Sequence, residues 1–181
     1  MMTVPSSTII IGIGNPYRSD DGVGVVVARQ LRELSPVGVT VIEESGEGAA
    51  LLDAWKGATT AILVDAVKSG APPGTIHRLD AHTEQIPTRF FHYSTHAFSV
   101  VEAVELSRAL GQLPSRLILY GIEGHSFSAG GRLSPEVERA ALKVVGQIIA
   151  EATGYAPATE TVNTVSAWER TWSVAERRDE K

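Results

Sequence analysis

The sequence contains no cysteine, and this absence removes several kinds of chemistry at once. Disulfide bridges, thiolate-bound zinc, iron–sulfur clusters and a cysteine nucleophile are all excluded. Any metal ion that this chain binds must therefore be held by carboxylate and imidazole groups.

Long basic runs and long apolar runs are also missing. No stretch of Lys or Arg reaches the density of a nucleic-acid-binding surface, and the formal net charge of the 181 residues is −5. The apolar run at residues 9–13 is too short to cross a membrane, and the MMTVPSS segment before it lacks the basic residues of a secretory signal. We expect a cytoplasmic protein that binds neither nucleic acid nor membranes.

What the sequence does contain is the pattern of a folded α/β protein. Its composition, 43% hydrophobic and 20% charged, is typical of globular domains. Short β-branched segments alternate with segments whose apolar residues recur at helical spacing, which predicts a parallel sheet with crossover helices. We predict a three-layer sandwich: a mostly parallel twisted sheet of about five strands with helices on both faces. This α/β domain should span residues 1–154, and the more polar stretch 155–181 is treated as a tail.

The individual elements follow from the same pattern. The predicted strands lie at residues 7–15, 37–44, 59–67 and 116–124, with a short edge or antiparallel strand at 75–80. The predicted helices lie at residues 22–34, 46–57, 94–111 and 135–152. Ser94 or Thr95 should cap the third helix, and Ser134-Pro135 is typical of a helix start, because proline fits the first helical position.

Polar residues at three places along the chain fall at the carboxyl edge of the predicted sheet, where open parallel sheets bind their ligands. Asp20 and Asp21 follow the first strand, Asp65 ends the third, and His96 opens the predicted third helix. Two carboxylates and one imidazole suit a divalent ion such as Zn, Mn, Fe or Ni, and they leave coordination positions open for water or substrate. A divalent metal site at this edge is one interpretation.

Each of these side chains also has an ordinary structural role open to it. Asp20 or Asp21 can cap the first helix, because Asp is a preferred N-cap residue. Asp65 can accept hydrogen bonds from loop amides, and His96 can be satisfied by backbone groups near a helix start. His92 could chelate a metal with His96 only if both were helical, whereas FFHYS is typical of an extended segment.

Two other functional classes fit the sequence less well. Tyr17 stands where a dinucleotide-binding loop has its third glycine, and two aspartates at the helix start would repel a pyrophosphate. There is no G-K-[ST] phosphate loop either. The segment around Ser126 resembles the nucleophile elbow of serine hydrolases, but Ser128 replaces its closing glycine and no histidine follows residue 125.

Several motifs resemble, in their order and spacing, those of the hydrogenase maturation proteases, which trim the large subunit of nickel–iron hydrogenases. The family signature G-x-G-N…D-D/E-G-x-G is present from Gly12 to Gly24. Further motifs follow in family order at Leu63–Val67, Pro73–Thr75, Ser94–His96, Gly121–Glu123 and Leu133–Val137.

The resemblance implies that Asp21, Asp65 and His96 bind the metal, that Asp21 and Asp65 belong to the catalytic site, and that Asp20 orients a ligand or caps a helix. It implies an endopeptidase that recognises nickel already installed in a hydrogenase large-subunit precursor and then removes a C-terminal extension. The alternative is a non-catalytic protein that inspects or carries nickel with the same side chains. The general base stays open between Asp21, Asp65 and a metal-bound water.

The sequence departs from the family pattern at two places. Pro16-Tyr17-Arg18 replaces the commoner aliphatic residues of the first loop, and His125 stands where many members have another residue. Both changes concern substrate fit, or an extra ligand, more than the three metal ligands that the resemblance implies.

Overall fold

A computed structural model of the chain describes residues 7–34, 36–91 and 99–153. The strands are β1 (Thr8–Ile13), β2 (Val39–Glu44), β3 (Thr60–Val67), β4 (Ile76–Asp80) and β5 (Arg116–Glu123). The α-helices are α1 (Val23–Leu34), α2 (Gly48–Ala54), α3 (Val100–Ala109) and α4 (Pro135–Thr153). Two 3-10 helices are η1 (Ser19–Gly22) and η2 (Thr88–Phe91).

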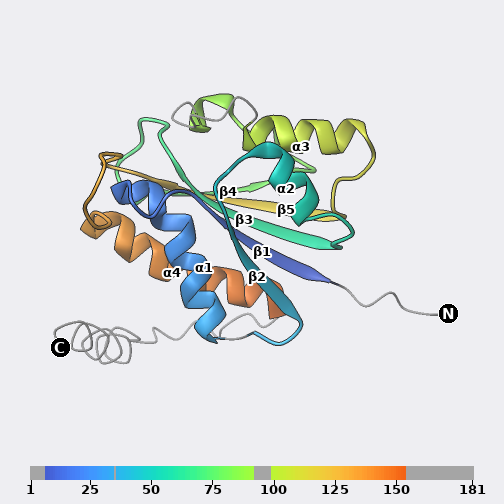
Figure 1. Ribbon diagram of the computed structural model, residues 1–181, viewed down its shortest axis with the longest axis horizontal. Coiled ribbons are helices and arrows are strands. Elements are labelled where there is room, and N and C mark those ends of the chain that lie inside the picture. The colour runs from blue at the N-terminus through green and yellow to red at the C-terminus, as the bar shows by residue number, and fades with distance from the viewer. Residues whose placement is uncertain (1–6, 35, 92–98, 154–181) are drawn as a thin grey trace.

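The predicted three-layer α/β architecture is confirmed. The sheet has the strand order β2-β1-β3-β5-β4, with α1 and α4 on one face and α2 and α3 on the other (Figure 1). Four strands are parallel, and β4 is the expected antiparallel edge strand, paired with β5. None of the described helices is long and apolar enough to cross a membrane. The predicted tail lies outside the described residues.

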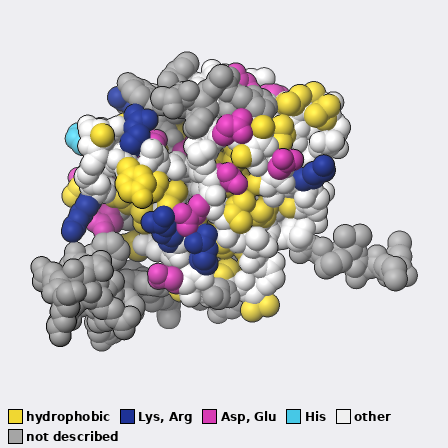
Figure 2. Space-filling model, in the orientation of Figure 1, with side chains coloured by type: hydrophobic (Ala, Val, Ile, Leu, Met, Phe, Trp, Pro, Cys, Tyr) yellow, Lys and Arg dark blue, Asp and Glu magenta, His cyan; other side chains and the backbone are white. Residues whose placement is uncertain are grey.

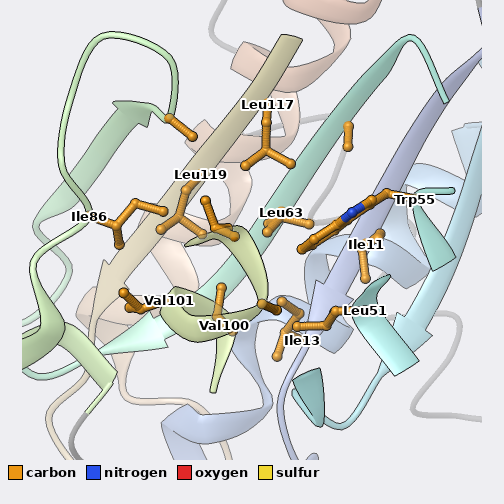
Figure 3. Packing of buried hydrophobic residues seen from close by; sticks show 14 of the residues in the cluster. Ile11, Ile13, Leu51, Trp55, Leu63, Ile86, Val100, Val101, Leu117 and Leu119 are labelled. Atoms are coloured by element: carbon orange, nitrogen blue, oxygen red, sulfur yellow. The ribbon is translucent and has the colours of Figure 1, made fainter. Parts of the chain in front are cut away.

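Alternate positions along each strand divide the core into two layers, because successive side chains of a strand point to opposite faces. The layer under α2 and α3 packs strand residues against two helices and against Trp55 (Figure 3). Its buried members include Ile11, Ile13, Leu51, Leu63, Val100, Val101, Leu117 and Leu119. The opposite layer joins Ile10, Ile62, Ile118 and Tyr120 to α1 and α4. Burial on both faces explains why the central strands are continuously apolar in sequence.

The start of the third helix differs from the prediction. α3 begins at Val100 with Ser99 as its N-cap, so Ser94 and Thr95 do not cap it. The backbone N–H of Ser99 donates to Glu102 Oε2 at 2.6 Å, which is the reciprocal hydrogen bond of a capping box. This local pairing fixes the first turn of α3. Residues 92–98, which include His96, lie outside the described part of the chain.

Glu151, near the end of α4, ties that helix to the sheet. Its carboxylate accepts hydrogen bonds from Arg78 at 2.6 and 3.1 Å, from Arg116 at 2.5 Å, and from the Tyr120 hydroxyl. Burial raises the pKa of Glu151, but the hydrogen bonds from Arg78 and Tyr120 outweigh it and hold the pKa below its ordinary value.

We predict that Glu151→Gln lowers the free energy of unfolding at neutral pH by about 1 kcal/mol, because the two arginines are partly exposed. The folded-state pKa lies below the unfolded-state value. The carboxylate therefore stabilises the fold above the unfolded-state pKa, and this contribution is lost as the pH falls through the folded-state pKa. Urea unfolding should show the difference between the two proteins shrinking from pH 7 to about pH 3. An undiminished difference at acid pH would contradict this assignment.

Candidate active site

Three loops meet beyond the carboxyl edge of the sheet: residues 14–22 after β1, residues 68–75 after β3 and residues 124–134 after β5. We call them the first, second and third loops. The first contains Asp20 and Asp21, and Asp65 lies in β3, just before the second. The carboxylates that the sequence analysis singled out therefore lie at the same edge.

The glycines of the first-loop motif permit unusually close contacts between backbones. A Cβ atom at Gly24 would lie 2.2 Å from Val64 O and 2.3 Å from Ile13 O. One at Gly14, whose φ is +133°, would lie 1.8 Å from Asp21 O. No side chain fits in such contacts, so the motif lets η1 and the start of α1 lie directly against β1 and β3. This packing brings Asp21 near Asp65.

We predict that Gly24→Ala lowers the free energy of unfolding by at least about 2 kcal/mol, because α1 must move away from two strands. Gly146→Ala in α4 is the matched control, since a Cβ atom there would have nothing within 4 Å. It should raise the free energy of unfolding by about 0.5–1 kcal/mol. Denaturant unfolding of both variants checks the pair, and equal effects would refute the steric explanation.

Asp20 is fully buried, and its carboxylate binds the third loop. Its Oδ2 accepts hydrogen bonds from the backbone N–H groups of His125 at 2.8 Å and Ser126 at 2.9 Å, and from Ser134 Oγ at 2.7 Å. Its Oδ1 accepts from Ser134 N at 2.6 Å. Ser134 directly precedes Pro135, the first residue of α4. Asp20 therefore holds the third loop and the start of α4 against the first loop.

The electrostatics of Asp20 fit this structural role. Burial raises the pKa of its carboxyl group, but the hydrogen bonds from Ser126, Ser134 and His125 together lower it below the ordinary value. The negative charge is thus stabilised in the folded protein. It also lies at the N-terminal end of α4, where the helix dipole favours an anion.

Asp65 has the opposite electrostatic environment. It lies between Leu63 and Val67 on the sheet face covered by α2 and α3, and only 7% of it is exposed. Burial raises the pKa of Asp65 well above its ordinary value, the charge of Asp21 raises it further, and a hydrogen bond from Ala66 N at 2.8 Å lowers it only in part.

Two neighbouring carboxylates are donors of the kind that divalent cations prefer. Asp21 is partly buried and close enough to Asp65 for their charges to repel. A cation between two such carboxylates would replace repulsion with attraction. His96, the predicted third ligand, lies outside the described residues, but η2 and α3 on either side of residues 92–98 cover the face on which Asp65 lies. Within the described ranges alone, no group of three His, Asp or Glu side chains could hold a metal.

Glu123 supports the second loop, a role that sequence reasoning missed. It is 1% exposed, and its carboxylate accepts hydrogen bonds from Ser69 N at 2.9 Å, Ser69 Oγ at 2.7 Å and Gly70 N at 2.9 Å. His77 Nε2 lies 3.5 Å from Glu123 Oε2, and the His77 ring packs against Phe90 with the centroids 4.8 Å apart. The glutamate of the Gly-Ile-Glu motif is the sequence feature from which this role could have been inferred.

We predict that Asp65→Asn stabilises the metal-free protein. The folded-state pKa of Asp65 is raised, so the carboxylate costs stability above its unfolded-state pKa, and this cost disappears at acid pH. At neutral pH and in the presence of a chelator, the free energy of unfolding should rise by about 1 kcal/mol or more. The control variant Asp53→Asn alters an exposed carboxylate of α2 and should leave the free energy of unfolding unchanged. Urea unfolding that shows a loss of stability for Asp65→Asn would contradict this account of the site.

Fold and site together define a class: an α/β domain with paired carboxylates beyond the carboxyl edge of a mostly parallel sheet. The family model described as hydrogenase maturation protease matches residues 25–151. The chain belongs to the hydrogenase maturation protease family.

Individual relatives agree with this assignment. The chain is 31% identical over 136 residues to the hydrogenase expression/formation protein HupD of Thiocapsa roseopersicina. The matched region spans 72% of this chain but only 60% of that protein, less than two thirds of its length. It is 27% identical over 146 residues to the hydrogenase 2 maturation protease of Escherichia coli, covering 78% of this chain and 88% of that one. An Escherichia coli endopeptidase structure superposes with a TM-score of 0.71 and 25% identity, covering 82% and 94% of the two chains.

Proposed function

We propose that the protein is an endopeptidase that removes a C-terminal extension from the nickel-loaded precursor of a nickel–iron hydrogenase large subunit. Its family supports proteolysis, and the names of its relatives support a hydrogenase substrate. The observation that carries the proposal is the pair of mutually repelling carboxylates, Asp21 and Asp65, at the edge of the sheet. We also propose that the protein acts in the cytoplasm.

In this proposal the nickel ion is part of the substrate. Asp21, Asp65 and the predicted ligand His96 would hold it, and it would polarise the scissile carbonyl or activate a water molecule. Without a cation, burial and the charge of Asp21 favour a proton on Asp65. A substrate that brings a cation relieves the repulsion and engages both carboxylates. A precursor without nickel does neither, so the electrostatics of the pair favour action on the loaded precursor.

The other groups at this edge would keep the two carboxylates in place. Asp20 fixes the first loop to the third, and Glu123 fixes the second. A site held by satisfied buried groups needs little rearrangement when the substrate arrives.

The test is to incubate the purified protein with nickel-loaded precursor and follow the precursor's mass. We expect loss of a C-terminal peptide with the unsubstituted protein and with Asp53→Asn, which alters an exposed carboxylate of α2. Asp65→Asn should reduce the rate by at least about 100-fold while remaining folded, because it removes a charged group that acts on the substrate's metal. Nickel-free precursor should stay intact.

Two outcomes would overturn the proposal. Precursor that binds the protein but is never shortened would indicate a non-catalytic protein that inspects or carries nickel. Equal cutting of nickel-loaded and nickel-free precursor would leave an endopeptidase but remove nickel recognition.

A further inference from the structure

Tyr17 is an exposed aromatic residue on a fixed backbone. Its residue surface is 80% exposed. Its backbone N–H donates to Asn15 Oδ1 at 2.9 Å, and its carbonyl accepts from Gly130 N at 2.8 Å. The next residue, Arg18, donates its N–H to Asn15 O at 3.1 Å. The loop is thus held from both sides while the ring points to solvent.

Two basic side chains contact Phe127 of the third loop. Arg18 Nη2 donates to Phe127 O at 3.4 Å, and Lys68 Nζ lies 5.9 Å from the centroid of the Phe127 ring. These contacts bring residues of the first and second loops onto the third. Figure 2 shows hydrophobic surface on the side of the molecule where α1 lies, with Lys and Arg side chains close by. In a chain with a net charge of −5, the cationic Arg18 lies only three positions before Asp21.

The location distinguishes Tyr17 from other exposed hydrophobic residues. Leu34 ends α1, Val37 follows that helix, and Leu110 follows α3. All three lie at the amino edge of the sheet, on the opposite side from Asp65. Tyr17 alone of these lies in a loop of the carboxyl edge, four positions before Asp21. Tyr and Arg are the side chains that contribute most at protein interfaces, and a rigid loop loses little entropy when it binds.

We propose that Tyr17 and Arg18 form the docking anchor for the hydrogenase large-subunit precursor. The anchor fits a segment of the precursor that carries an apolar side chain against the Tyr17 ring and an acidic side chain or backbone carbonyl against Arg18. The guanidinium group has donors beyond the one that Phe127 O accepts. This inference rests on the proposed function, because it takes the partner from it.

The experiment measures affinity for the nickel-loaded precursor in an Asp65→Asn background, so that cutting does not interfere. Tyr17→Ala should weaken binding by about tenfold or more, and Tyr17→Phe by less than about threefold, because the ring provides most of the contact. Val37→Ala removes an even more exposed side chain, 96% accessible, at the far edge, and should leave affinity unchanged. Within the Asp65→Asn background, the melting temperatures should be equal, because none of these three substitutions alters a buried group.

Cleavage by proteins with Asp65 intact separates the two proposals. If docking is correct, Tyr17→Ala raises KM in proportion to the lost affinity and leaves kcat unchanged. Precursor that binds Tyr17→Ala as tightly as the unsubstituted protein overturns the docking proposal, even if cutting is normal. Precursor that binds through Tyr17 but is never cut keeps the docking proposal and overturns the endopeptidase. Absence of any binding to the unsubstituted protein, with Asp65 intact, overturns both.

Discussion

The site depends on one buried carboxylate, that of Asp20. A buried charge is costly unless hydrogen bonds replace its hydration, and Asp20 receives four, three from backbone N–H groups and one from a hydroxyl. All of them come from the segment 125–134, between β5 and α4. One side chain therefore joins the loop after the first strand to the loop after the last.

Fixing Asp20 also fixes the direction of its neighbour. Residues 19–22 form a 3-10 turn, in which successive side chains point about 120° apart. The first aspartate is directed at the third loop, whereas the charge of the second raises the pKa of Asp65 in β3. The motif glycines make this possible, because Gly14 and Gly24 allow the turn to lie against β1 and β3. The two adjacent aspartates thus have different roles: Asp20 holds the third loop, and Asp21 acts on Asp65.

The two carboxylate environments also differ in what they do to stability. Asp20 is held as an anion and stabilises the folded chain, whereas Asp65 is buried beside a like charge and destabilises it. Unfavourable electrostatics retained in a folded protein are typical of functional positions. In the proposed function, a substrate that carries a cation relieves this repulsion. Electrostatics alone then favour the metal-loaded precursor over the unloaded one.

Sequence reasoning reached the architecture because the relevant signals are local. β-branched runs such as Thr60–Val67 and the Ser134-Pro135 pair predict a buried strand and a helix start without knowledge of the rest. The role of Asp20 was not predictable in the same way, because its partners lie 105 to 114 positions away. A pair of adjacent aspartates carries no sign of which one will be buried.

Competition between nearby capping residues explains why α3 begins later than predicted. Ser94 and Thr95 are good capping residues, but Ser99 has a glutamate three positions later and therefore forms the capping box of α3. Glu123 lies in a motif that was recognised, yet its use as an anchor for Ser69 and Gly70 depends on strand order, which spacing does not reveal.

The most direct test of the central claim compares Asp20→Asn with Asp21→Asn by urea unfolding of the metal-free protein at neutral pH. The account predicts that Asp20→Asn loses about 2–4 kcal/mol, because a buried and fully hydrogen-bonded charge is removed. Asp21→Asn should lose less than about 1 kcal/mol, since it also removes the repulsion felt by Asp65. Equal losses, or a greater loss for Asp21→Asn, would contradict the division of roles between the two aspartates.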